Sequence, residues 1–261
     1  MKYAALAALC AAMLAACATQ SQKPMALYDP NALPTGTPGQ LIAYGRELVE
    51  HTRAHMGSNV GVTMDCSACH IAAGTKARGG SFVGVYGQFP QWSVRAHRMI
   101  ALQDRLAECF LYSMNGRPPA YTSREMIAMV AYIAYLSRGI PVGATPDPAV
   151  KLVKFNPPQP ASATRGAQLY AQRCAICHGQ SGRGNAVYPP LWGAHSFNSG
   201  AGMHRLWTMA AFVRWNMPQN NPGSLTPQQA YDVSAYVLSH SRPRLAGGRS
   251  IAFPGRPARF F

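Results

Sequence analysis

Apolar residues recur at helical spacing in several separate stretches of this chain. Pro38 opens the first stretch, in which Leu41, Ile42 and Leu48 fall on one face of a helix. The same spacing predicts further helices over residues 93–110, 126–136, 205–215 and 227–237, and in the segment that leads from residue 165 toward residue 174. The pattern therefore predicts an all-α chain.

Capping signals mark the starts of two of these helices. Thr122 and Glu125 have the spacing of a capping box just before the apolar run that begins at residue 126. Thr226 and Gln229 have the same spacing, with a proline at the first helical position between them. Each signal predicts where a terminal helix of a domain begins.

Six prolines and no helical period occur between residues 141 and 164, which predicts a linker. The linker separates a first domain (residues 38–140) from a second domain (residues 165–242). Residues 17–37 have no periodicity and are expected to form a flexible tether. Residues 243–261, rich in arginine, glycine and proline, are expected to form an extended basic tail.

A pentapeptide with two cysteines and a histidine occurs once in each half, as Cys66-Ser67-Ala68-Cys69-His70 and as Cys174-Ala175-Ile176-Cys177-His178. This pattern is the c-type haem attachment signature: two thiols add to the haem vinyl groups, and the adjacent histidine ligates the iron. A single copy could also be half a zinc site or a redox dithiol. Two complete copies favour two covalently attached c-type haems, with iron ligands His70 and His178.

The amino terminus predicts export. Lys2 precedes an apolar run that ends at Leu14, which is typical of a signal peptide over residues 1–16. Small residues before Cys17 resemble a lipoprotein cleavage box, so a lipid anchor on Cys17 is expected; an ordinary signal cut nearby is the alternative. No later apolar run reaches the ~20 residues of a membrane span, so we expect a periplasmic protein.

The net charge of +15 at pH 7 narrows the choice of partners. No nucleic-acid recognition motif is present, and an exported protein does not meet nucleic acid, so that class of partner is excluded. An anionic substrate, an acidic redox partner or an anionic membrane surface fits the charge.

The cysteine count leaves one thiol over. Of seven cysteines, one lies in the signal, Cys17 is the lipidation candidate and four belong to the haem motifs, so Cys109 has no disulfide partner.

Met217 follows His178 by 39 residues, in a position suited to the second axial ligand of that iron, with Met203 and Met209 as alternatives.

The same offset of 39 residues from His70 falls on Cys109, which we therefore expect to ligate the first iron. Met114 and Met99 are the alternatives. A thiolate ligand lowers the potential of its haem and can also bond to a substrate sulfur. Three arginines, Arg95, Arg98 and Arg105, lie upstream of Cys109 in the expected helix and could bind an oxyanion.

Together these residues resemble the dihaem thiosulfate dehydrogenases; the matching segments are Cys66–His70, Arg95, Arg105, Cys109-Phe110, Ser113–Gly116, Cys174–His178 and Asn216-Met217-Pro218. The resemblance implies two fused class I cytochrome c-like domains. It implies that two thiosulfates are coupled into tetrathionate at a haem held by His70 and Cys109. It also implies that Arg95 and Arg105 hold the substrate.

The resemblance further implies that electrons pass to the second haem, ligated by His178 and Met217, and then to a soluble or membrane-bound cytochrome. Some members carry a ligand-exchanging lysine where this chain has Asn216, so no such exchange is expected. Two alternatives stay open: a dihaem electron carrier without a substrate, and another sulfur-oxyanion oxidoreductase, including one that reduces tetrathionate.

Overall fold

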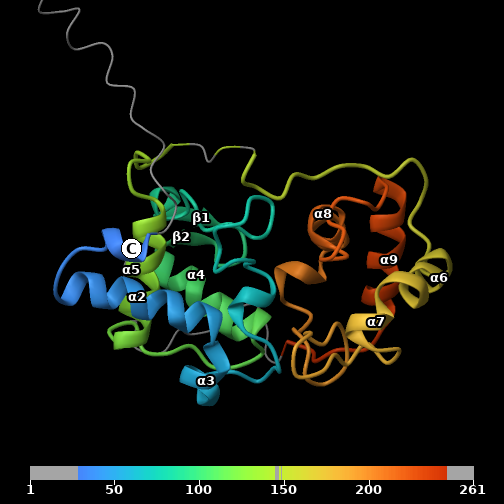
Figure 1. The fold of residues 1–261 in the computed structure, drawn as a ribbon, viewed down its shortest axis with the longest axis horizontal. Coiled ribbons are helices and arrows are strands. Elements are labelled where there is room, and N and C mark those ends of the chain that lie inside the picture. The colour runs from blue at the N-terminus through green and yellow to red at the C-terminus, as the bar shows by residue number, and fades with distance from the viewer. Residues whose placement is uncertain (1–28, 145–146, 148, 246–261) are drawn as a thin grey trace, which may run out of the picture.

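The computed structural model describes residues 29–144, 147 and 149–245. The first domain contains α2 (Thr37–Glu50), α3 (Thr52–Met56), α4 (Leu102–Glu108) and α5 (Arg124–Leu136), and the second contains α6 (Ala163–Arg173), α7 (Ala175–His178), α8 (Leu206–Asn216) and α9 (Pro227–Ser239). The two domains lie side by side (Figure 1). The predicted arrangement of two largely helical domains is confirmed. The signal peptide, the lipidation candidate and residues 246–261 lie outside the described residues.

Short helical turns fill much of the rest of the fold. They are the 3-10 turns Pro30–Ala32, Gly57–Asn59, Cys66–Ala68, Tyr86–Gln88 and Gly202–His204, and the π-helical turn Cys109–Ser113. Among the described residues, every helix is too short or too polar to cross a lipid bilayer.

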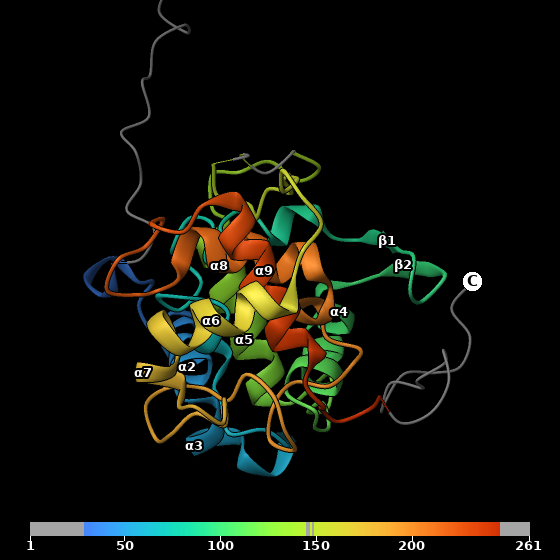
Figure 2. The ribbon, with the colours of Figure 1, turned by 90° about the vertical axis from the view of Figure 1, so that its right-hand side faces the viewer.

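Each domain is built on a crossing of its first and last long helices, α2 with α5 and α6 with α9 (Figures 1 and 2). A glycine lies at each crossing. A Cβ atom on Gly45 would lie 2.0 Å from the carbonyl oxygen of Ala128, and one on Gly166 would lie 2.0 Å from that of Asp232. The two helix pairs therefore approach so closely that only glycine fits, and the same device occurs in both halves of the chain.

The helix starts agree with one capping prediction and correct the other. Thr226 caps α9 as expected: its hydroxyl accepts from the Gln229 backbone N–H, and the Gln229 side chain accepts from the Thr226 N–H. For α5 the cap is Ser123, whose hydroxyl accepts from the Met126 N–H, and not Thr122. Adjacent serine and threonine offer the same chemistry, and the sequence did not distinguish them.

The predicted helix over residues 93–110 is wrong in its first half. Residues 91–100 form an antiparallel hairpin of β1 (Gln91–Ser93) and β2 (Arg98–Ile100), and α4 begins only at Leu102. The Ser93 hydroxyl accepts from the Ala96 N–H, and His97 has a left-handed backbone (φ 51°), which closes the turn. The hairpin projects from the body of the molecule in Figure 2.

The two domains contact each other through the segment around Asn198. The Asn198 side-chain amide donates to the carbonyl of Leu111 (2.8 Å) and to the side chain of Asn115 (3.1 Å), both in the first domain. Its backbone N–H donates to the Tyr112 carbonyl. Asn198 is almost completely buried, so these hydrogen bonds fix the second domain against the turn that follows Cys109.

Candidate haem and substrate site

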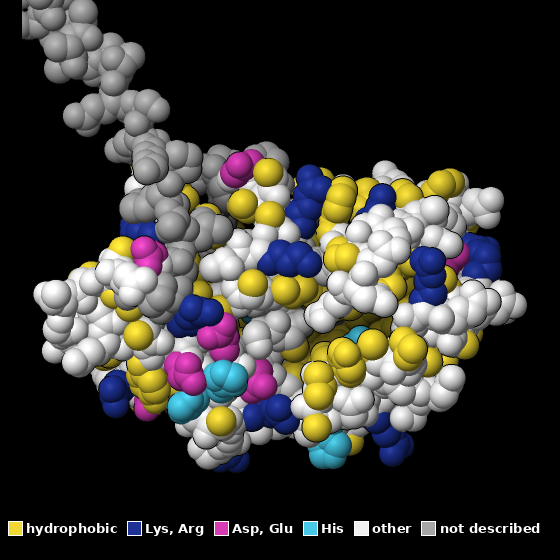
Figure 3. All heavy atoms as spheres, viewed as in Figure 1, with side chains coloured by type: hydrophobic (Ala, Val, Ile, Leu, Met, Phe, Trp, Pro, Cys, Tyr) yellow, Lys and Arg dark blue, Asp and Glu magenta, His cyan; other side chains and the backbone are white. Residues whose placement is uncertain are grey.

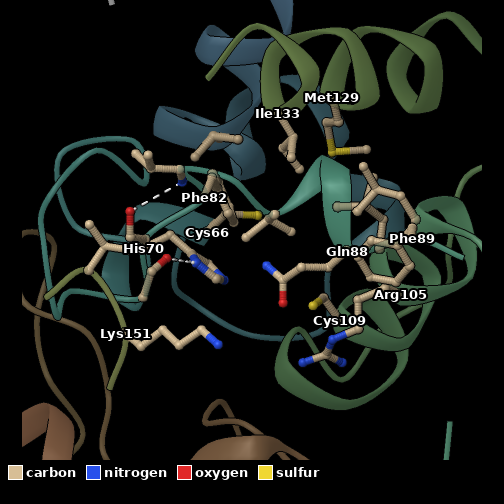
Figure 4. Close-up of a pocket in the computed structure, with 18 of the residues that line it drawn as sticks. Cys66, His70, Phe82, Gln88, Phe89, Arg105, Cys109, Met129, Ile133 and Lys151 are labelled. Carbon is tan, nitrogen blue, oxygen red and sulfur yellow. Dashed lines mark hydrogen bonds between the residues drawn. The ribbon is translucent and has the colours of Figure 1, made fainter. Parts of the chain in front are cut away.

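A cavity of about 390 Å³ lies in the first domain. Its lining comes from the first haem motif, the loop after it, α4 and its π-helical turn, α5 and the linker (Figure 4). Most of the lining side chains are apolar, among them Phe82, Leu102, Phe110 and Ile133. The cavity has the size and character of a cofactor pocket.

His70 is held in the orientation that an iron ligand needs. Its Nδ1 donates to the carbonyl oxygen of Gly80 (2.5 Å), which leaves Nε2 free, and its ring stacks on Phe82 (4.2 Å between centroids). Burial lowers the pKa of His70 to about 4; the Gly80 carbonyl opposes this shift, and the charge of Arg105 adds to it. His70 is therefore neutral at pH 7, the form that ligates a metal.

Cys66 and Cys69 are free thiols beside this histidine. Burial raises the pKa of Cys66 to about 12 and that of Cys69 to about 11, with the nearby Cys109 contributing to both shifts. Uncharged thiols can lie against an apolar porphyrin edge without a desolvation cost. Cys66 and His70 line the cavity, whereas Cys69 lies behind the lining, so Cys66 and His70 are the motif residues that fit haem attachment as the side chains stand.

Cys109 lies opposite this motif in the lining, where α4 ends and a π-helical turn begins (Figure 4). The Met114 N–H donates to the Cys109 carbonyl, five residues back, and this wider turn carries the cysteine. Such turns are frequent at functional sites. The cavity therefore brings the Cys109 sulfur and the His70 ring into one lining.

Arg105 lines the same cavity, one helical turn before Cys109. Its Nη1 donates to the Glu108 carboxylate (3.1 Å), and about half of its side chain stays exposed. The proximity of Cys109, together with Glu108 and against the effect of burial, raises the pKa of Arg105, so it remains a cation. The cavity therefore keeps a positive charge near Cys109.

Arg95 and Arg98 are not brought to the lining, because the hairpin directs them elsewhere. Arg98 pairs with the buried carboxylate of Asp104 through two hydrogen bonds (3.2 and 3.3 Å). The Arg95 guanidinium lies over the Tyr112 ring (4.0 Å) and donates through Nη2 to the Gly200 carbonyl (2.7 Å). Its Nη1 is buried without a hydrogen-bond partner among the described residues.

Four polar lining residues were missed by sequence reasoning: Ser81 and Gln88 from the loop after the haem motif, Gln91 from β1, and Lys151 from the segment expected to be a linker. No motif marks any of them. Of the alternative sulfur ligands, Met114 lines the cavity, whereas Met99 is 52% exposed on β2 and does not. Met129 of α5 lines the cavity as well and was not considered.

The second domain repeats the histidine arrangement. His178 Nδ1 donates to the carbonyl of Pro189 (2.9 Å), burial lowers the pKa of His178, and burial raises the pKa of Cys174 to about 11. Figure 3 shows the surface of this domain hollowed, with hydrophobic side chains around the hollow. The residues therefore fit a second haem.

The predicted sixth ligand of this haem, Met217, directly follows α8. Its N–H donates to the Val213 carbonyl, so the helix fixes its backbone. Met209 is buried within α8, and Met203 lies on a short 3-10 turn before it. Asn216 is fully buried, and its side chain donates to the carbonyl of Arg78 (2.7 Å) across the domain interface.

Comparisons with known proteins agree with this geometry. Residues 58–142 match the family described as SoxA/TsdA, cytochrome c domain, and residues 163–241 match the family cytochrome c. The thiosulfate dehydrogenase of Allochromatium vinosum is 40% identical over 225 residues, which cover 81% of this chain and 82% of that protein. The thiosulfate dehydrogenase of Stutzerimonas stutzeri is 39% identical over 221 residues, which cover 81% and 71%.

A solved structure resembles the fold as well. The thiosulfate dehydrogenase TsdBA from Marichromatium purpuratum, in its as-isolated form, superimposes with a TM-score of 0.79 at 35% identity. The match covers 88% of this chain and 50% of that one, so this chain spans half the length of that protein. The two domains are thus cytochrome c domains, which bind haem c. Because thiosulfate dehydrogenases match this chain over most of its length, the chain belongs to the thiosulfate dehydrogenase family.

Proposed function

We propose that this chain is a periplasmic dihaem cytochrome that oxidises two thiosulfates to tetrathionate. One observation carries the proposal: Cys109 lies in the same cavity as His70, beside cations, and the described lining contains no carboxylate. Such a cavity attracts a sulfur oxyanion and presents a sulfur atom to it. The names of the relatives support the same substrate for this chain.

In this proposal His70 and Cys109 hold the first haem and His178 and Met217 the second, with covalent bonds to Cys66, Cys69, Cys174 and Cys177. Bound haems supply two one-electron acceptors. The chain positions them: Gly80 and Pro189 fix the histidine rings, and the apolar lining excludes water from the first site.

Cys109 carries the sulfur chemistry. Its thiolate would form a disulfide bond with the outer sulfur of one thiosulfate, a two-electron oxidation for which the two bound haems would supply the one-electron acceptors. The outer sulfur of a second thiosulfate then attacks the sulfur that came from the first. Tetrathionate leaves, and the Cys109 thiolate is restored. Arg105 orients the sulfonate end through its paired donors, and Arg95 supports the turn that follows Cys109 through Tyr112.

The electrons then leave from the second haem to an external cytochrome, soluble or membrane-bound. The expected export signal and the lipidation candidate Cys17 support an exchange in the periplasm, with the chain tethered to the membrane if Cys17 is acylated. The basic character of the chain favours an acidic acceptor.

The proposal is tested by mixing the oxidised, haem-loaded protein with thiosulfate without oxygen. We expect reduction of the haems with formation of tetrathionate, which becomes catalytic when ferricyanide is added. Haems that stay oxidised, in protein that dithionite reduces normally, would instead indicate an electron carrier or a different sulfur substrate. Reoxidation by tetrathionate would indicate the reverse reaction.

We expect Arg105, in α4, to contribute more to thiosulfate turnover than Arg98, in the hairpin. Arg105→Gln removes a cation from the cavity and is expected to lower kcat/KM for thiosulfate by about 100-fold, since charge-assisted hydrogen bonds contribute about 1.5–3 kcal/mol each. Steady-state kinetics with ferricyanide measures the effect. Arg98→Gln is the matched control, because Arg98 binds Asp104 outside the cavity. Equal losses in both variants would contradict a substrate role for Arg105.

A further inference from the structure

Lys151 enters the cavity of the first domain from the linker between the two domains. Figure 4 shows its side chain extending along the mouth of the cavity, toward the side where Cys109 and Arg105 lie. Its neighbours Val150 and Leu152 are lining residues too, so three consecutive residues form one wall. The lysine itself is exposed, as a residue at an entrance is.

The position of this wall is fixed by contacts with both domains. The Arg78 N–H, in the loop after the first haem motif, donates to the Val150 carbonyl (3.0 Å). Arg78 is itself held by the second domain: its carbonyl accepts from Asn216 (2.7 Å), and its guanidinium lies over the Trp215 ring (3.8 Å). Lys151 therefore does not belong to a loose connector, and its approach to the cavity is built into the domain interface.

Among the described residues, no carboxylate pairs with Lys151 to neutralise its charge. The described lining of the cavity contains two permanent cations, Lys151 and Arg105, and no aspartate or glutamate. Arg105 already forms an ion pair with Glu108. Of the two cations in the described lining, Lys151 is therefore the one whose charge no described carboxylate offsets. Two cations around an apolar cavity favour an anion between them.

We propose that Lys151 is a substrate-binding residue that contacts the sulfonate group of thiosulfate at the mouth of the cavity, on the side away from Arg105. The inference rests on the proposed function and extends it to a residue of the linker. Because the ammonium binds the anion in the ground state and in the transition state alike, it lowers KM and leaves the chemical step unchanged.

The test compares Lys151→Gln with Lys154→Gln in the haem-loaded, full-length protein. Lys154 is exposed in the same segment but does not line the cavity, so it is the matched control. We expect Lys151→Gln to raise KM for thiosulfate about 10-fold with kcat changed less than about twofold, as loss of one charge-assisted hydrogen bond predicts. Lys151→Arg should restore most of the affinity, and Lys154→Gln should match the wild type.

A binding measurement separates this inference from the proposed reaction. Calorimetric titration of the oxidised protein with tetrathionate needs no turnover, and Lys151→Gln should weaken its Kd by a similar factor. Unchanged KM and Kd, or no binding of tetrathionate to the wild type, would overturn the role of Lys151. The role would also be overturned if Lys151→Gln shifted the reduction potential of the first haem and left KM unchanged, because the lysine would then pair with a haem carboxylate. A wild type that binds these anions without oxidising thiosulfate would contradict only the proposed reaction.

Discussion

Replacing Cys109 by alanine is expected to lower thiosulfate turnover by on the order of 10⁴-fold while both haems stay attached. In the proposed reaction the thiolate forms the disulfide bond with the substrate, and removal of a nucleophile has effects of this size. The fold should survive, because Cys109 has no disulfide partner among the described cysteines and lies at the edge of a cavity. Turnover with ferricyanide, together with the pyridine haemochrome spectrum for haem content, measures both properties.

A second substitution at the same position separates the two roles of the sulfur. Cys109→Met keeps a sulfur that can ligate iron but cannot form a disulfide, so turnover should be lost as in the alanine variant while the potential of the first haem rises. Met114→Leu, in the same lining, is the control and should retain turnover. Activity retained in Cys109→Ala would refute the nucleophilic role, and activity retained only in Cys109→Met would leave Cys109 as a ligand alone.

Replacing Gly45 by alanine is expected to lower the free energy of unfolding by about 3 kcal/mol, the upper end for overpacking a core. The added Cβ would lie 2.0 Å from a carbonyl oxygen of α5, and neither backbone can move without separating the two helices. Gly166→Ala should have the same effect in the second domain, against α9. The midpoint of urea unfolding of the haem-loaded protein measures the change.

Gly57→Ala is the control for this prediction. Gly57 has a helical backbone (φ −55°, ψ −34°) and no atom within 4 Å of the position of a Cβ. Alanine there should be neutral or slightly stabilising, because it reduces the entropy of the unfolded chain. If Gly45→Ala unfolded at the same urea concentration as Gly57→Ala, the close approach of α2 and α5 would not contribute to stability.

The sequence predicted the helices that have a strong period and a capping residue. The segments 126–136, 205–215 and 227–237 all appear as helices in the structure, shifted by no more than a few residues. The haem motifs and the leftover thiol were equally visible, because their chemistry depends on short spacings. Cys109 does lie in one cavity with His70, as the common offset of 39 residues suggested, although the roles of these residues stay predictions.

The hairpin and the cavity wall could not be found in the same way. Apolar residues between 93 and 110 also fit a helical period, but the Ser93 hydrogen bond, the left-handed His97 and the pairing of β1 with β2 turn the chain back. Lys151 reaches the cavity because its neighbour Val150 accepts a hydrogen bond from Arg78, which is far away in the sequence and marked by no motif. Periodicity and spacing report on neighbours along the chain, so sites assembled by tertiary contacts escape them.

The wall formed by residues 150–152 limits how far this chain can be treated as modular. A fragment that stops at residue 142, where the first family match ends, would keep His70, Cys109 and all of the first domain's helices. Its cavity would lack the wall formed by residues 150–152. A chimera with a foreign second domain would lose the support that Asn216 and Trp215 give to the loop that holds the wall. The natural unit for transplanting this chemistry is therefore the first domain together with the linker and the face of the second domain that supports it.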